Sequence, residues 1–155
     1  MDETTRRRVE ALLAHYVDVV DQDRLAEWPD LFVDNCRYLV TNAEAHRQKL
    51  PHGVIFADSR GMLRDRVSAL REANVYEAQR YRHIVGPIWI EDEADGVVRA
   101  RSNFLVVRTM LDGEMMLFAC GVYFDRIDVM ADCRFIERIV VTDSDRIDTL
   151  LAIPL

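Results

Sequence analysis

The chain has 155 residues, of which half are hydrophobic and 30% are charged, and its formal net charge is −7. These values are typical of a folded globular protein with one core and exclude a disordered chain, and the acidic excess disfavours binding to nucleic acid. No apolar run approaches the roughly 20 residues that span a bilayer and no signal-peptide pattern opens the sequence, so we expect no membrane association and a cytoplasmic location.

The first part of the chain has the pattern of helices followed by a short strand. The stretch VEALLAHYVDVV (9–20) places apolar side chains at helical spacing, which predicts an amphipathic helix capped by Asp2 or Thr4. A second, short helix is predicted in LAEWPDLF (25–32), with Pro29 in its first turn. The alternating stretch CRYLVT (36–41) predicts a strand.

Residues 42–57 have no sustained period and contain Pro51 and Gly53, which predicts a long loop that is functional or lies against a partner. A further helix is predicted in GMLRDRVSALREANVY (61–76). Its inward-facing side chains would be Met62, Leu63, Val67 and Leu70.

From Tyr81 onward the pattern changes to strands. The pairs Asp95-Gly96 and Asp112-Gly113 favour hairpins, because a type I′ turn needs positive φ at both central residues. We therefore predict four long antiparallel strands, at 82–91, 97–110, 114–128 and 134–143.

Helices followed by a curved antiparallel sheet predict an α+β fold, an NTF2-like cone with N-terminal helices packed on the sheet. Because no linker or repeat divides the sequence, we expect a single NTF2-like domain over residues 1–155. The cone interior would be filled by the bulky side chains of the later strands, which are Phe104, Leu105, Val107, Met115, Met116, Leu117 and Phe118.

Motifs that bind metals or supply nucleophiles are missing from the sequence. The spacing of His46 and His52 matches no known ligand pattern, and no cysteine lies within three residues of a histidine, as a Rieske site would require. No HExxH, phosphate-loop, dinucleotide or G-x-S-x-G motif is present. Cys36 and Cys120 are expected to be structural, whereas Cys133 sits near a turn and could be exposed.

Acid–base chemistry inside the cone is the remaining catalytic option. His83, Tyr38, Tyr123 and Asp65 could supply such a set, although a buried histidine with a structural partner is the more frequent case. Strand alternation puts Arg82 and His83 on opposite faces, so only one of them can point into the cone.

Several stretches, in this order, resemble the small (β) subunit of aromatic-ring-hydroxylating dioxygenases, and the resemblance covers nearly the whole chain. They are WPDLF (28–32), CRY (36–38), MLRDRVSALRE (62–72), RYRHIVG (80–86), SNFLVVRT (102–109) and the closing IPL (153–155). Within the family, ALREANVYE (69–77) and DTLLAIPL (148–155) are most similar to terephthalate 1,2-dioxygenase small subunits, and next to those of salicylate 5-hydroxylases.

The resemblance implies an NTF2-like subunit without catalytic residues, cofactors or metals of its own. It implies a self-trimer that binds three large (α) subunits as an α3β3 hexamer. The large subunit would hold the Rieske [2Fe–2S] cluster and a mononuclear Fe(II), and a separate reductase would deliver electrons from NAD(P)H. The substrate would be an aromatic carboxylate such as terephthalate, dihydroxylated during aromatic degradation.

The candidate subunit-interface residues are chosen because arginine and aromatic side chains are enriched at interfaces. They are Arg80, Tyr81, Arg82, His83 and Trp89. The alternative for this stretch is pairing within the chain, for instance of Arg66 or Arg82 with Asp65 or Glu72. Two further segments are expected to be covered. They are the 42–57 loop with Val54, Ile55 and Phe56, and the C-terminal Leu150, Leu151, Ile153, Pro154 and Leu155.

Two functions of other classes stay open. The first is a stand-alone NTF2-like isomerase or dehydratase that uses His83 with Asp65 or Tyr38. The second is a dimeric NTF2-like binding module.

Overall fold

The computed structural model describes residues 1–155 except 73–77, 93 and 147–152. The first helix, α1, runs over Glu3–Asp21. Asp2 caps it, as predicted, by accepting a hydrogen bond from the Thr5 amide at 2.8 Å. The predicted apolar stripe is buried at Val9, Leu12, Leu13, Tyr16 and Val20. Val17, which the spacing also places on the stripe, is only partly buried, and Val19 is buried in addition.

The predicted second helix is only a short 3₁₀ turn, η1, at Trp28–Leu31, with Pro29 as its second residue. The first strand, β1, covers Phe32–Asn42 and is longer than predicted. The predicted 42–57 loop is wrong in part, since it contains the helix α2 (Ala43–Arg47) and the strand β2 (Ile55–Ala57).

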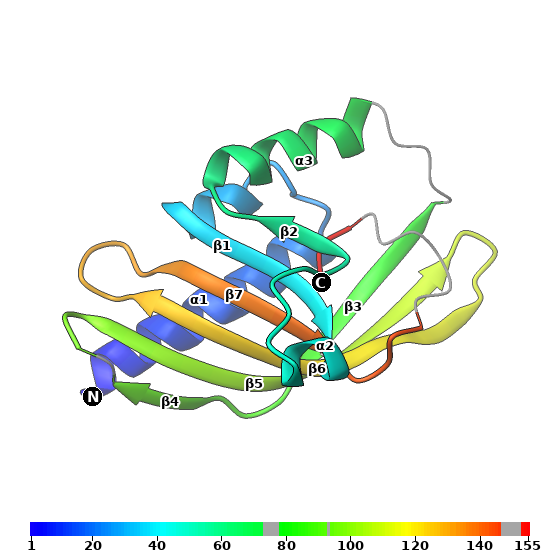
Figure 1. The fold of residues 1–155 in the computed structure, drawn as a ribbon. Coiled ribbons are helices and arrows are strands. Elements are labelled where there is room, and N and C mark those ends of the chain that lie inside the picture. The colour runs from blue at the N-terminus through cyan, green and yellow to red at the C-terminus, as the bar shows by residue number, and fades with distance from the viewer. Residues whose placement is uncertain (73–77, 93, 147–152) are drawn as a thin grey trace.

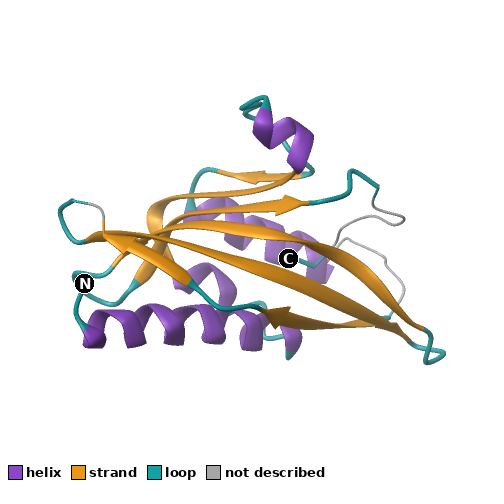
Figure 2. Ribbon diagram, turned by 90° about the horizontal axis from the view of Figure 1, so that it is seen from below, coloured by secondary structure: helices purple, strands orange, loops and turns teal. Residues whose placement is uncertain are grey.

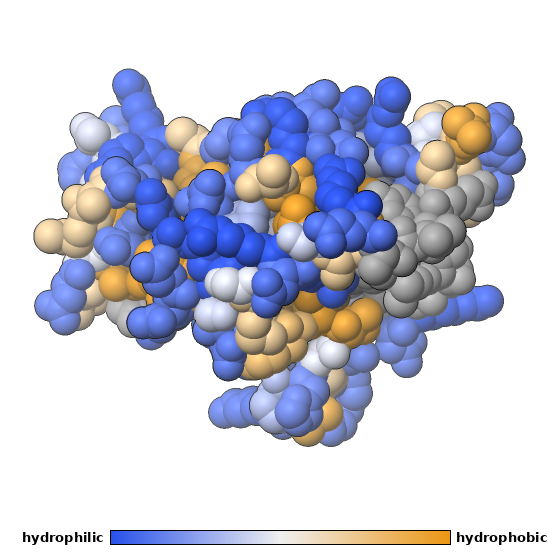
Figure 3. Space-filling view, turned by 90° about the horizontal axis from the view of Figure 1, so that it is seen from above, coloured by the Kyte–Doolittle hydropathy of each residue, from blue (hydrophilic) through white to orange (hydrophobic). Residues whose placement is uncertain are grey.

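Helix α3 spans Arg60–Glu72, and residues 73–76 of the predicted helix lie outside the described residues. Leu63 and Leu70 are buried as expected, and Val67 packs against the core. The prediction for Met62 is wrong, because its side chain is 40% exposed. The face of the molecule that carries α3 is mainly hydrophilic, with separate small apolar patches (Figure 3).

The later strands are β3 (Gln79–Val85), β4 (Trp89–Asp92), β5 (Val97–Met110), β6 (Met115–Asp128) and β7 (Arg134–Thr142). The single strand predicted at 82–91 is therefore two strands, separated at residues 86–88, where Pro87 has no amide to donate. Asp95 and Gly96 have φ of 60° and 73°, as a type I′ turn requires, whereas at the second Asp-Gly pair only Gly113 has positive φ, 91°.

The strands form one curved sheet in the order β2-β1-β7-β6-β5-β3, with β4 beside β5. It is not wholly antiparallel as predicted, because β1 and β7 pair in parallel. Helix α1 lies on one side of this sheet and α2 on the other (Figures 1 and 2). Helices on a curved sheet confirm the α+β prediction.

The core lies between α1 and the sheet and is rich in aromatic rings. Tyr16 and Trp28 pack edge-on against Phe32, and Tyr123 stacks on Phe104 with ring centroids 4.4 Å apart. The prediction that all the bulky side chains of 104–118 fill this interior is wrong, because Met115 and Leu117 are 70% and 63% exposed.

Candidate functional site

All of the stretch RYRHIVG except its glycine lies in β3, an edge strand whose side chains alternate between two faces of the sheet. Tyr81 and His83 point inward and are buried, whereas Arg80, Arg82 and Ile84 point outward and are exposed. Arg82 and His83 therefore lie on opposite faces, as alternation predicts.

His83 is held by Asp21 at the C-terminal end of α1. The His83 amide donates to Oδ2 of Asp21 at 2.8 Å, and Nδ1 lies 2.6 Å from Oδ1. Both side chains are almost fully buried. The pair joins residues 62 positions apart and fixes the edge strand to the helix, which is the structural reading of a buried histidine.

The acid–base set considered from the sequence is not brought together. Asp65 is exposed on α3. The hydroxyl of Tyr38 is engaged with the main chain of Leu155 at 3.0 Å. His83 thus has neither Asp65 nor Tyr38 as a partner, so the catalytic set named for the isomerase or dehydratase alternative is not assembled.

A buried ion pair that sequence reasoning missed lies next to this region of the core. Arg138 of β7 donates two hydrogen bonds of 2.8 Å to Asp125 of β6, and both side chains are fully buried. The guanidinium also lies over the rings of Tyr16, Tyr123 and Phe135, at 4.0, 4.2 and 4.3 Å. Burial alone would lower the pKa of Arg138, but the Asp125 carboxylate outweighs it and raises that pKa above its ordinary value.

The cysteines have the environment of structural thiols. Cys36 and Cys133 are buried, and burial raises the pKa of each thiol. The suggestion that Cys133 is exposed is wrong. Among the residues that the structure describes, no group of three His, Cys, Asp or Glu side chains is arranged to hold a metal ion, and no helix is long and apolar enough to cross a membrane.

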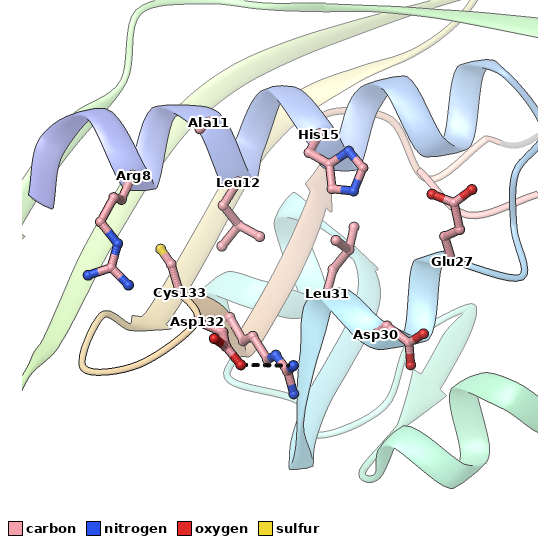
Figure 4. A pocket seen from close by; sticks show the side chains of 10 residues that line it. Arg8, Ala11, Leu12, His15, Glu27, Asp30, Leu31, Asp132 and Cys133 are labelled. Atoms are coloured by element: carbon pink, nitrogen blue, oxygen red, sulfur yellow. Dashed lines mark hydrogen bonds and ion pairs between the residues drawn. The ribbon is translucent and has the colours of Figure 1, made fainter.

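A surface hollow lies between α1, η1 and the β6–β7 turn (Figure 4). His15 points into it from α1, while Glu27 and Asp30 line its far side. The two arginines that line the hollow already have partners within the chain. Arg8 donates to the Val129 carbonyl at 2.8 Å, and Arg134 pairs with Asp132 at 3.1 Å. The hollow is open and its charges are balanced within the chain.

The side of the sheet turned away from α1 is here called the outer face, and it carries exposed arginine and apolar side chains together. The strand register places Arg82, Val107 and Leu117 beside one another on it, and Arg80, Thr109 and Met115 in the next row. All of these side chains except Leu117 border a groove that lies over β5, between β3 and β6.

The same face continues toward β4. Trp89 is 53% exposed, and the Arg101 guanidinium lies 5.3 Å from the centre of its ring. Of the five interface candidates, Arg80, Arg82 and Trp89 are exposed on the outer face, whereas Tyr81 and His83 are buried within the chain.

The other two segments that we expect to be covered are buried only in part. Ile55 is buried, whereas Val54 and Phe56 are 60% and 44% exposed. Ile153, Pro154 and Leu155 are buried as predicted, and Leu150 and Leu151 lie outside the described residues.

Comparisons with known proteins identify the family. Residues 15–149 match the family model described as "Ring hydroxylating beta subunit". One relative is subunit beta 1 of the terminal oxygenase component of terephthalate 1,2-dioxygenase from Comamonas sp. It is 44% identical to this chain, and the match covers 96% of this chain and 97% of the relative. The anthranilate 1,2-dioxygenase small subunit from Burkholderia cepacia is 37% identical, over 90% and 88%.

The structural comparison agrees with the sequence comparison. A crystal structure described as the β subunit of an aromatic-ring-hydroxylating dioxygenase from Novosphingobium aromaticivorans superposes with a TM-score of 0.90 at 38% identity, covering 99% of this chain and 98% of that one. The match confirms the NTF2-like α+β fold. The chain belongs to the family of ring-hydroxylating dioxygenase β subunits.

Proposed function

We propose that this chain is the small subunit of the terminal oxygenase of an aromatic-ring-hydroxylating dioxygenase, where it supports a catalytic large subunit. The observation that carries the proposal is the 44% identity to a terephthalate dioxygenase β subunit across almost the whole of both chains. In this role the chain contributes binding surface and rigidity, and the oxidation takes place in the partner.

The proposed substrate of the assembled enzyme is an aromatic carboxylate such as terephthalate. Terephthalate and anthranilate, the substrates in the names of two relatives, are both carboxylates on an aromatic ring. The large subunit would carry the [2Fe–2S] cluster and the Fe(II), and NAD(P)H would supply electrons through a separate reductase. The expected assembly is α3β3 around a trimer of this chain.

The outer face is the proposed surface for neighbouring subunits. It combines exposed apolar side chains, Ile84, Met115 and Leu117, with the arginines of β3. Apolar groups of this size are rarely left in water together, and arginine offers a fork of donors to carboxylates and carbonyls of a neighbour. Within RYRHIVG, Arg80 and Arg82 would make the contacts, while Tyr81 and His83 hold the strand in place.

Co-expression with a large subunit of a terephthalate dioxygenase tests the function. We expect one complex of equal stoichiometry by light scattering, with the visible absorption of an iron–sulfur cluster. With a reductase and NADH it should convert terephthalate to a cis-dihydrodiol. This chain by itself should consume no O2, and O2 consumption or stoichiometric iron binding by the chain alone would contradict the proposal.

Charge reversal tests the proposed surface separately. Arg82→Glu should dissociate the co-expressed complex on sizing chromatography, because the outward guanidinium is replaced by a carboxylate. The matched control is Arg7→Glu, an exposed arginine on α1, on the opposite side of the sheet. An intact Arg82→Glu complex would remove β3 from the interface and leave the family function standing.

A further inference from the structure

A second groove on the outer face, here called the tryptophan groove, lies over β5 and β6 and has a volume of about 300 Å³. The register places Trp89, Arg101 and Phe124 in one row across β4, β5 and β6. The Arg101 guanidinium lies 5.3 Å from the centre of the exposed Trp89 ring. An arginine that stacks on an aromatic ring keeps the donors along its edge available to an acceptor. The groove therefore presents a cation beside aromatic side chains.

The carboxylates that border the tryptophan groove leave Arg101 without an ion pair. Asp125 is buried and bound to an arginine of β7, and Glu137 pairs with an arginine of β1. Glu91 lies in the next row of side chains, two residues along β4 from Trp89. Within the described residues Arg101 forms no ion pair, and its contact is the Trp89 ring. The groove is thus suited to a ligand group that carries a carboxylate and an apolar side chain.

The turn between β5 and β6, here called the hairpin tip (residues 111–114), carries those two kinds of group. Leu111 is 81% exposed, and the exposed carboxylates of Asp112 and Glu114 follow it. The Met110 amide donates to the Glu114 carbonyl at 2.9 Å, and the Glu114 amide donates to Oδ1 of Asp112 at 2.9 Å. A turn that is already formed loses little conformational entropy when it binds. The tip is therefore prepared to enter a groove.

The hairpin tip cannot occupy the tryptophan groove of its own chain. Arg101 and Leu111 are ten residues apart along β5, which corresponds to roughly 30 Å of extended strand. In Figure 1 the β5–β6 turn lies at the right-hand end of the molecule and β4 lies at the left. Only a second copy can bring a tip of this chain to the groove. Such a contact is head-to-tail, and head-to-tail contacts generate closed rings when the rotation between copies closes.

We propose that the hairpin tip of one copy binds in the tryptophan groove of the next, and that three such contacts close the trimer. Leu111 of one copy packs on Trp89 of the next, and a carboxylate of the tip accepts from Arg101. This inference rests on the proposed function, which expects a trimer of this chain, and it assigns the contact that holds the trimer together. Tryptophan and arginine are the residue types that most often carry the energy of an interface. The arginines of β3 then remain for the large subunit.

Chemical cross-linking in the full chain tests the contact. Glu91→Cys with Glu114→Cys places one thiol beside the groove and one on the tip, while Trp89, Arg101 and Leu111 stay in place. A short bismaleimide, which cannot span the roughly 30 Å within one chain, should link this variant into species of two and three chains. The matched control pairs Glu114→Cys with Met62→Cys, an exposed position on α3, and should stay unlinked. Linked species that are absent, limited to two chains, or equally abundant in the control would overturn the proposal.

Reversal of the two charges tests the ion pair through the same cross-linking yield. Adding Arg101→Glu to the cysteine pair should lower the yield at least about tenfold, because the carboxylate of Asp112 then meets a like charge. Asp112→Lys should lower it as well, and the two reversals together should restore it. The matched control Arg7→Glu, on α1, should leave the yield unchanged. An unchanged yield with Arg101→Glu, or no recovery in the combined variant, would overturn the proposal.

The same cross-linking, carried out on the chain alone and on the complex co-expressed with a large subunit, separates this inference from the proposed function. If linked rings form but no large subunit is bound, the proposed function fails and the contact between copies stands. If a large subunit is bound but the complex yields no linked species, the proposed function stands and the tip-to-groove contact is wrong.

Discussion

The two faces of the sheet differ in how their polar groups are satisfied. On the inner face, charged side chains meet partners from the same chain: Arg138 meets Asp125, and His83 meets Asp21. On the outer face, Met115 and Leu117 of β6 are exposed in the same rows as the arginines of β3, with β5 between them. These inner-face ion pairs form within the chain, whereas the outer face combines apolar side chains with arginine, as subunit interfaces commonly do. Substitutions on the inner face should change stability, and those on the outer face should change assembly.

The largest effect on stability is expected for Asp125→Ala. It leaves the Arg138 charge buried without its carboxylate, which should lower the free energy of unfolding by about 3–5 kcal/mol. Urea denaturation measures the change. Glu137→Ala is the matched control on β7, because its pair with Arg37 is partly exposed and should contribute less than about 1 kcal/mol. Similar losses for both variants would contradict a special role for the buried pair.

A smaller loss is expected for Asp21→Ala. The His83 amide and Nδ1 both lose their acceptor in a buried setting, which should cost about 1–3 kcal/mol and speed hydrogen exchange of the His83 amide. The control is Asp18→Ala, an exposed carboxylate one turn earlier that pairs with Arg24. If His83 exchange is unchanged in Asp21→Ala, the carboxylate does not hold the edge strand.

Tyr16→Phe should have a milder effect. It removes one hydroxyl that donates to Leu155, and about 1 kcal/mol of stability is expected to be lost in thermal or urea unfolding. Tyr123→Phe is the comparison, because its buried hydroxyl has no partner within the described residues and its removal should be neutral or stabilising. If Tyr123→Phe lowered the free energy of unfolding more than Tyr16→Phe does, the contact with Leu155 would not stabilise the fold.

The smallest effect on stability is expected on the outer face. The double substitution Met115→Ser and Leu117→Ser should change unfolding by no more than about 0.5 kcal/mol, since both side chains are largely in water. The same variant should fail to co-purify with the large subunit. Met62→Ser, an exposed apolar residue on α3, should change neither property. If the double variant were less stable but still bound the large subunit, the outer face would serve stability and not assembly, contrary to our assignment.

The sequence predicts well the features that local chemistry determines. Helix α1 follows from the spacing of its apolar residues and from the Asp2 cap, and the turn at Asp95-Gly96 follows from the need for positive φ. Helix α2 escapes detection because five residues are too few to show a period. The parallel pairing of β1 with β7 joins distant segments, and no local pattern encodes it.

The site is harder to predict than the fold, and the reasons are specific. Met115, Met116, Leu117 and Phe118 are all apolar, so alternation carries no information about which of them face outward. Asp21 is one of 27 acidic residues, and nothing in the sequence marks it as the partner of His83. The outward direction of Arg82, in contrast, follows from alternation once His83 is placed inside.

The parallel pair also affects the order in which the chain can fold as it is synthesised. Until Arg134–Thr142 has left the ribosome, the one neighbour of β1 among the described strands is the three-residue strand β2. Contacts between segments about 100 residues apart form slowly, because a long loop must close before they contribute. We therefore expect the sheet to close only after β7 has been synthesised, so that a partner subunit that binds the closed sheet meets a chain already made as far as Thr142.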